Sequence, residues 1–178
     1  SSGGEGHRDR LMSVRFPAAL PESARRCWER FVSSGAAPAN ADRRYLETFQ
    51  IGATKEDADQ GAALVVAGRK TATSSLDWEF DDAPEARPYV GAISILEDGS
   101  GRPACVVATT WVEVVSYGSL TLDFVRDYGE TLPSLEAWYA VFDPFYRAQC
   151  AELGRPLTPD TPLLCERFHM LFVPTPVG

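Results

Sequence analysis

Lysine, histidine and long apolar runs are all scarce in this chain of 178 residues. The longest unbroken apolar stretch runs only from Ala62 to Ala67, whereas a membrane-spanning helix needs roughly 20 such residues. His7 and His169 are the two histidines, so a metal site built from several histidines is excluded and any histidine triad would depend on His169. The chain does not open with a basic segment followed by an apolar one, so we expect a cytoplasmic protein without a membrane partner.

Cysteines are few and far apart, and no Cys-x-x-Cys pair occurs: the four stand at Cys27, Cys105, Cys150 and Cys165. Structural zinc sites usually combine closely spaced Cys or Cys/His pairs. The spacing therefore predicts buried, reduced thiols and no metal site, and nothing in the sequence indicates a cofactor.

Positive charge is also in short supply, because the formal net charge is −8. Residues 1–60 carry nine basic and nine acidic side chains, so residues 61–178 account for the whole excess of negative charge. Proteins that bind long nucleic acids need a broad basic face, so we do not expect long duplex DNA as a partner. A small ligand, or a short single strand over a local patch, stays compatible with this composition.

The basic residues are almost all arginine, and the two lysines are Lys55 and Lys70. Arginine stays charged at any working pH, whereas burial can convert a lysine into a base or a nucleophile. Lys70 lies in the segment Ala67–Thr73, which makes it a candidate for chemistry. The alternative is that Lys70 forms an ion pair with an acid and that Thr71 and Thr73 are ordinary strand residues.

Periodicity and capping residues predict a mixed chain. Residues 1–20 have no apolar period and indicate a flexible tail, followed by a single domain over 21–178. The expected helices run from Pro21 to Gly35, from Thr54 to Gly68, and from Ser134 to Gly154 with a kink or restart at Pro144. Strands are expected near 45–51, 71–76, 90–96, 103–117 and 163–173. A loop that holds Asp123, Asp127, Gly129 and Glu130 is expected to lead to Ser134. Successive strands with segregated helices favour an α+β fold, most simply a small curved β-barrel with flanking helices.

The segment Leu64–Leu76 has the sequence LVVAGRKTATSSL. It stands in order with the segments Phe49–Gly52, Trp78–Phe80, Val90–Ile95, Pro103–Val107, Trp111–Val115 and Cys165–Phe168. This ordered set resembles the ASCH domain family, which is related in fold to PUA RNA-binding domains. The resemblance extends over about residues 21–173 and favours the longer bacterial branch of the family.

The resemblance implies a PUA-like barrel with a cleft beside the Gly68–Thr73 loop. Family members have been proposed to bind RNA; one branch removes the acyl group from acetylated cytidine, and the longer branch has been linked to single-stranded ribonuclease activity. The catalytic lysine, threonine and glutamate of the acyl-removing branch correspond here to Lys70, Thr73 and Glu130. The sequence departs from the family pattern at Tyr128, where an acid is common, and at Phe142, where a histidine is expected.

These residue types suit hydrolysis. A lysine with a lowered pKa can take the proton of a hydroxyl, which would activate Thr73 toward an acyl carbon. A carboxylate such as Glu130 can hold the lysine or pass the proton to the leaving amine. Backbone amides near Gly68 can stabilise an oxyanion.

Other residues are candidates for substrate contact, namely Gly68, Arg69, Thr71, Trp78 and Arg167, with Arg87 and Trp111 as further possibilities. Trp78 and Trp111 offer stacking surfaces for a base or belong to the core, and the arginines contact phosphate or are solvated. We therefore expect a hydrolase-like protein acting on a nucleoside or short single-stranded RNA. The alternatives are a non-catalytic RNA-binding module and a partner protein whose cleft has lost its function.

Overall fold

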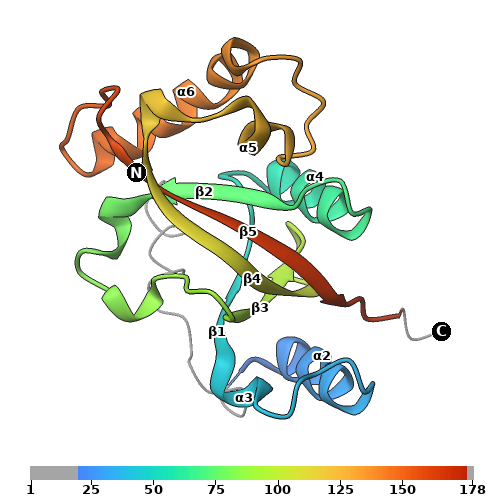
Figure 1. Cartoon of the computed structure of the whole chain (residues 1–178). Coiled ribbons are helices and arrows are strands. Elements are labelled where there is room, and N and C mark those ends of the chain that lie inside the picture. The colour runs from blue at the N-terminus through green and yellow to red at the C-terminus, as the bar shows by residue number, and fades with distance from the viewer. Residues whose placement is uncertain (1–19, 176–178) are drawn as a thin grey trace.

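The computed structural model describes residues 20–175, which form a five-stranded sheet with helices around it (Figure 1). The strand order is β1-β3-β4-β5-β2. Neighbouring strands are antiparallel except for β1, which runs parallel to β3. The strands are β1 (Tyr45–Phe49), β2 (Ala72–Leu76), β3 (Ile93–Glu97), β4 (Pro103–Ser116) and β5 (Pro162–Phe172).

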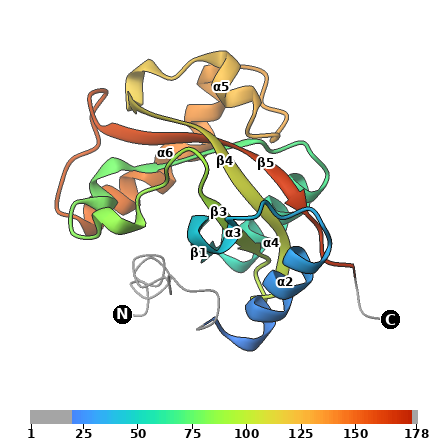
Figure 2. The ribbon, with the colours of Figure 1, turned by 60° about the horizontal axis from the view of Figure 1, so that its bottom comes forward.

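The helices gather at opposite ends of the molecule. In Figure 1, α5 and α6 lie on one side of the long strands β4 and β5, and α2 and α3 lie on the other, and Figure 2 shows α5 and α2 far apart at opposite ends of the view. The α-helices are α2 (Glu22–Ser33), α3 (Ala41–Arg44), α4 (Lys55–Val66), α5 (Leu122–Arg126) and α6 (Leu135–Glu152). Three short 3-10 helices complete the described chain: η2 (Asp77–Phe80), η3 (Pro84–Ala86) and η4 (Tyr117–Ser119).

Two helix starts confirm the capping prediction. The Thr54 hydroxyl accepts a hydrogen bond from the amide of Asp57 at the start of α4, and the Ser134 hydroxyl does the same for Ala137 in α6. Pro144, however, lies inside one continuous helix, so the predicted restart is wrong. Proline removes a single backbone donor, and buried residues on either side of it pack in the same apolar cluster, which holds α6 together.

The sheet does not close, so the predicted β-barrel is wrong. Within residues 20–175, no strand pairing joins β1 to β2, the two edges of the sheet. The beginning of β2 is instead covered by a loop, because the carbonyl of Asp127 accepts hydrogen bonds from the amides of Thr71 (2.8 Å) and Ala72 (3.1 Å). The observed class is α+β with an open five-stranded sheet.

The region before α6 is more ordered than predicted. Residues 122–126 form the short helix α5, in which the Thr121 hydroxyl caps Phe124, and Phe124 and Val125 are buried. A helix of five residues is too short to leave a 3.6-residue period in the sequence, so packing rather than pattern determines it.

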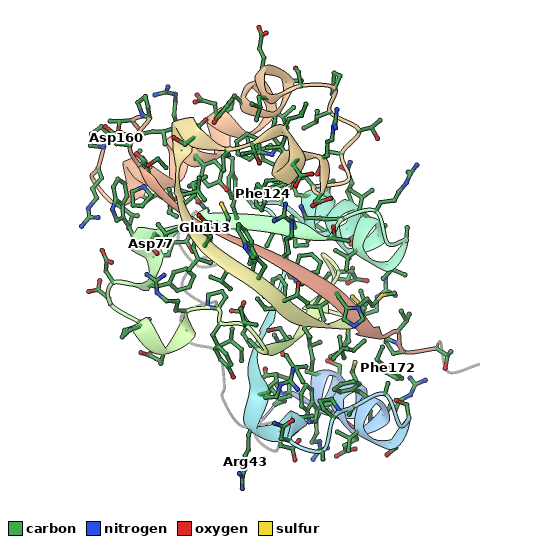
Figure 3. All side chains as sticks on the ribbon, viewed as in Figure 1. Arg43, Asp77, Glu113, Phe124, Asp160 and Phe172 are labelled. Atoms are coloured by element: carbon green, nitrogen blue, oxygen red, sulfur yellow. The ribbon has the colours of Figure 1, made fainter. Side chains whose placement is uncertain are left out.

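Apolar clusters fill the spaces between the sheet and the helices. The largest lies between the sheet and α5 and α6 and contains the fully buried Trp138 and Tyr146. A second cluster packs α2 against the sheet and includes Leu20, so the last residue of the predicted tail 1–20 belongs to the core. Residues 1–19 of that tail lie outside the described residues. Figure 3 labels one aromatic residue near each end, Phe124 on α5 and Phe172 beside α2.

All four cysteines are buried, as predicted, and none of them forms a disulfide. Over the described part of the chain, no helix is long and apolar enough to cross a membrane.

Candidate functional site

Lys70 follows a tight turn that links α4 to β2. Gly68 ends α4 with a φ of +74°, a conformation that glycine adopts without the steric cost that a Cβ brings. The next two amides, those of Arg69 and Lys70, both donate hydrogen bonds to the carbonyl of Leu64 (2.9 and 3.1 Å). The turn therefore fixes the backbone from which the Lys70 side chain extends.

A second loop, residues 127–131, packs directly against this turn. Besides the two hydrogen bonds to Asp127, the loop approaches through Gly129, whose φ is +73°. A Cβ at Gly129 would lie 2.5 Å from the carbonyl oxygen of Arg69 and 2.8 Å from the amide nitrogen of Lys70. Only glycine permits so close an approach, and the two loops together form the candidate site.

The side chain of Lys70 is enclosed, with 2% of the residue exposed. Its Nζ lies 3.9 Å from the centroid of the Tyr128 ring, and within residues 20–175 it makes no hydrogen bond or ion pair. Burial lowers the pKa of Lys70 to about 7, because the charged amine loses its hydration, and the charge of Glu130 opposes part of this shift. Near neutral pH, a large fraction of Lys70 is therefore the neutral amine.

Tyr128 is held in place from both ends. Its hydroxyl and that of Tyr146 both hydrogen-bond to the Ser74 hydroxyl on β2. Its ring makes edge contacts with Phe124, Trp138 and Phe142. Burial raises the pKa of Tyr128 well above its usual value, so the ring that faces Lys70 carries no phenolate charge at neutral pH.

Glu130 is half-buried and stands between two residues with positive φ. Thr131, which follows it, has a φ of +55°, which is rare for a β-branched residue and costs on the order of 1–3 kcal/mol. This unusual backbone turns the chain from the edge of β2 toward α6. It keeps Glu130 close enough for its charge to raise the pKa of Lys70.

Thr73 lies on the other side of β2. Ala72 and Leu76 belong to the cluster under α6, and Ser74 bonds to tyrosines of that cluster, so these residues share one face. Alternation along the strand places Thr73 on the opposite face, where it pairs in register with Glu166 of β5. Glu166 is buried and accepts a hydrogen bond from Thr109 (3.2 Å). The structure therefore brings Lys70 and Glu130 together and places Thr73 beside a different carboxylate.

Arg167, a candidate phosphate contact, is already engaged. Its guanidinium forms ion pairs with Asp127 (3.1 Å) and Asp123 (3.2 Å) and lies over the ring of Trp111, with 4.8 Å between the guanidinium carbon and the ring centroid. These contacts tie α5 and the loop after it to β5. Arg167 thus supports the position of the loop that carries Glu130.

The remaining candidates differ in accessibility. Gly68 and Arg69 are exposed and Thr71 is half-buried. The Trp78 ring is covered by the guanidinium of Arg155, whose central carbon lies 4.6 Å from the ring centroid. Arg87 forms a 2.6 Å ion pair with Asp77.

His169 is exposed on β5. Within the described range, no three His, Cys, Asp or Glu side chains are grouped so that they could hold a metal ion.

Three residues of the site were not among the sequence-based candidates: Tyr128, Ser74 and Glu166. Ser74 had a usable signal, since apolar residues at 72 and 76 indicate that position 74 shares the buried face of a strand. Tyr128 stood out in the sequence only as a departure from a family pattern. Glu166 is set by strand register, which the sequence does not specify.

Comparison with known proteins agrees with this architecture. The family model described as the ASCH domain matches residues 47–171. The crystal structure of an ASCH domain from Lactobacillus crispatus JV V101 is similar at a TM-score of 0.77 and 26% identity, over 86% of this chain and 96% of that one. A protein from Enterococcus faecalis V583 is similar at a TM-score of 0.73 and 25% identity, over 84% of this chain and 88% of that one. None of the curated proteins matches.

Proposed function

The chain belongs to the ASCH domain family, and we propose that it is a hydrolase acting on a nucleoside or a short single-stranded RNA, of the acyl-cytidine amidohydrolase or ribonuclease type. The observation that carries the proposal is Lys70, an enclosed amine whose pKa is lowered to about 7. A general base works best when its pKa lies near the working pH. A lysine that served only to neutralise phosphate would be expected to keep its charge and its hydration.

Glu130 is the carboxylate best placed to assist Lys70. Its charge acts on the amine without forming an ion pair with it, so the neutral form of Lys70 stays accessible. A carboxylate at this position favours the lysine ammonium that forms when the base takes up a proton. Glu130 can then pass that proton from Lys70 to the leaving group.

The nucleophile in our proposal is Thr73. Lys70 removes the proton of the Thr73 hydroxyl, the oxygen bonds to the acyl carbon, and the bond to the leaving amine breaks as that amine takes up the proton. Water then hydrolyses the acyl-threonine ester. Because Lys70 rests on the Ser74 face of β2, the lysine must rotate around this edge of the sheet to reach Thr73, a movement for which its side chain has four rotatable bonds.

Substrate contacts are assigned to exposed and half-buried groups first. Gly68, Arg69 and Thr71 lie on the turn before β2 and would meet a ligand without losing a partner side chain. Trp78 would have to exchange Arg155 for the ligand, and Arg167 would have to exchange Asp123 and Asp127 for it. We therefore expect the turn to contribute more to binding than Trp78 or Arg167.

The test is hydrolysis of acetylated cytidine and of a short single-stranded RNA by wild type, Thr73→Val and Ser74→Ala. Val replaces Thr at nearly constant volume and deletes the hydroxyl, so Thr73→Val should abolish turnover of the active substrate. Ser74→Ala removes the strand hydroxyl on the lysine's side of β2 and leaves the Thr73 hydroxyl in place, so it should retain more turnover than Thr73→Val. Loss in Ser74→Ala with retention in Thr73→Val would reverse the assignment of the nucleophile.

Salt dependence separates the hydrolase from a non-catalytic RNA-binding module. Binding of an uncharged nucleoside should change little with salt, whereas binding to RNA phosphates should weaken steeply as salt rises. No turnover of either substrate, together with strongly salt-dependent RNA binding, would replace the hydrolase by the binding module.

A further inference from the structure

We propose that Tyr128 is the positioning residue of Lys70: its ring is the surface on which the amine rests, and its hydroxyl anchors that ring to β2. The proposal deepens the proposed function and rests on it, because it identifies the group that prepares Lys70 to act as a base. Tyr128 itself would not touch the substrate.

The first support is the contact geometry. The Nζ atom lies 3.9 Å from the ring centroid, within the range of about 6 Å in which an ammonium is attracted to an aromatic face. An aromatic ring attracts the ammonium more weakly than a carboxylate would, and it accepts the neutral amine without an energetic penalty for an unpaired charge. Lys70 can therefore lose its proton while it rests on the ring, before the side chain rotates toward Thr73.

The second support is the rigidity of the ring. The Tyr128 hydroxyl is bound to Ser74, which is also bound to Tyr146 of α6. Gly129, the next residue, packs against the backbone of Arg69 and Lys70. The Tyr128 ring and the backbone of Lys70 are thus held at a fixed distance by two independent sets of contacts.

The third support is the set of charged and titratable groups around Lys70. The loop after α5 contributes Tyr128 and Glu130, α6 contributes Tyr146, and the turn before β2 contributes Arg69, which is exposed. Burial raises the pKa of both tyrosines, so they stay neutral. Among these groups, Glu130 is the one whose charge acts on Lys70.

The chain offers an unusually direct test because it has two lysines. Lysine labelled with ¹³C and ¹⁵N gives one side-chain NMR signal for Lys70 and one for Lys55, and the exposed Lys55, paired with Asp59 at 2.8 Å, serves as an internal reference. A Lys70→Met variant assigns the signals. In the wild type, Lys70 should titrate at about pH 7, far below Lys55, whose pKa is raised by the pairing with Asp59.

Substitutions at Tyr128 should move the Lys70 midpoint in opposite directions. Tyr128→Leu keeps the site apolar but removes the ring, and the midpoint should fall by about 0.4 to 1.5 pH units. Tyr128→Asp places a carboxylate beside the amine, and the midpoint should rise by about 1 to 3 pH units. Lys55 should not move in either variant. If the Asp variant does not fold, the Leu variant carries the test.

Two control variants isolate the ring from the hydroxyls. Tyr128→Phe keeps the ring but loses its anchor to Ser74, so the midpoint should move much less than in Tyr128→Leu. Tyr146→Phe removes a hydroxyl that does not belong to the ring under Lys70 and should leave the midpoint unchanged. A Lys70 midpoint that stays or rises in Tyr128→Leu, or that moves as far in Tyr128→Phe as in Tyr128→Leu, would overturn the proposal. The titration needs no substrate, so absence of turnover combined with the expected midpoints would contradict the proposed function alone.

Discussion

Replacing Gly129 by alanine should separate the two loops of the site. The added Cβ would lie 2.5 Å from the carbonyl oxygen and 2.6 Å from the carbonyl carbon of Arg69, and 2.8 Å from the amide nitrogen of Lys70. All three are backbone atoms, and the carbonyl of Leu64 holds the amides of Arg69 and Lys70 in place. The clash therefore cannot be relieved by rotating a side chain.

Two costs combine in Gly129→Ala. The φ of +73° costs an alanine about 1–2 kcal/mol relative to glycine, and forcing a methyl group into a closely packed contact adds about 1–3 kcal/mol. The free energy of unfolding should fall by about 2–5 kcal/mol. Urea denaturation followed by tryptophan fluorescence measures this change.

Gly68→Ala is the matched control. Gly68 has nearly the same φ, +74°, but no atom lies within 4 Å of the position that its Cβ would occupy. Gly68→Ala should therefore lose only the conformational part, about 1–2 kcal/mol. Equal destabilisation by the two substitutions would refute the close packing of the loops on which the site depends.

Three further outcomes follow from the contacts. Thr54→Ala should lower the free energy of unfolding by about 0.5–2 kcal/mol, because the Thr54 hydroxyl caps α4; calorimetry that shows no loss would contradict the cap. Asp123→Ala should change stability by less than about 0.5 kcal/mol, because its side chain is 91% exposed and exposed ion pairs contribute little. Lys70 binds a proton more weakly in the folded than in the unfolded protein, so the free energy of unfolding of the wild type should rise by about 2 kcal/mol relative to that of Lys70→Met as the pH increases from 7 to 9. If chemical denaturation gives the same pH dependence of this free energy for both proteins, the lowered pKa of Lys70 is disproved.

Local signals in the sequence were sufficient to predict most elements of the fold. Hydroxyls at Thr54 and Ser134 mark two helix starts, and β-branched runs followed within two residues by a glycine mark β3 and β4. Closure of the sheet was mispredicted because it depends on how the edges are covered. At β2 the cover is the carbonyl of Asp127, which follows a helix too short to be recognised from its pattern.

In the candidate site, too, local sequence patterns predicted some features, and long-range packing determined the others. Lys70 was recognisable from its motif and from the rarity of lysine in the chain, and the structure places Glu130 near it. The burial of Lys70 against Tyr128 depends on the packing of a loop more than 50 residues away in the sequence, and no local pattern encodes such a contact. The register that sets Thr73 beside Glu166 is likewise a property of the sheet, not of either strand alone.

The pH dependence of acetylcytidine hydrolysis, compared between wild type and Lys70→Arg, tests the role of Lys70 most directly. Arginine keeps the positive charge but cannot lose its proton at working pH, so it separates a base from a simple charge. The wild-type rate should rise with pH around a midpoint of about 7, and Lys70→Arg should be slower by about 10²–10⁴. A Lys70→Arg variant that keeps the wild-type rate would contradict a catalytic base at this position.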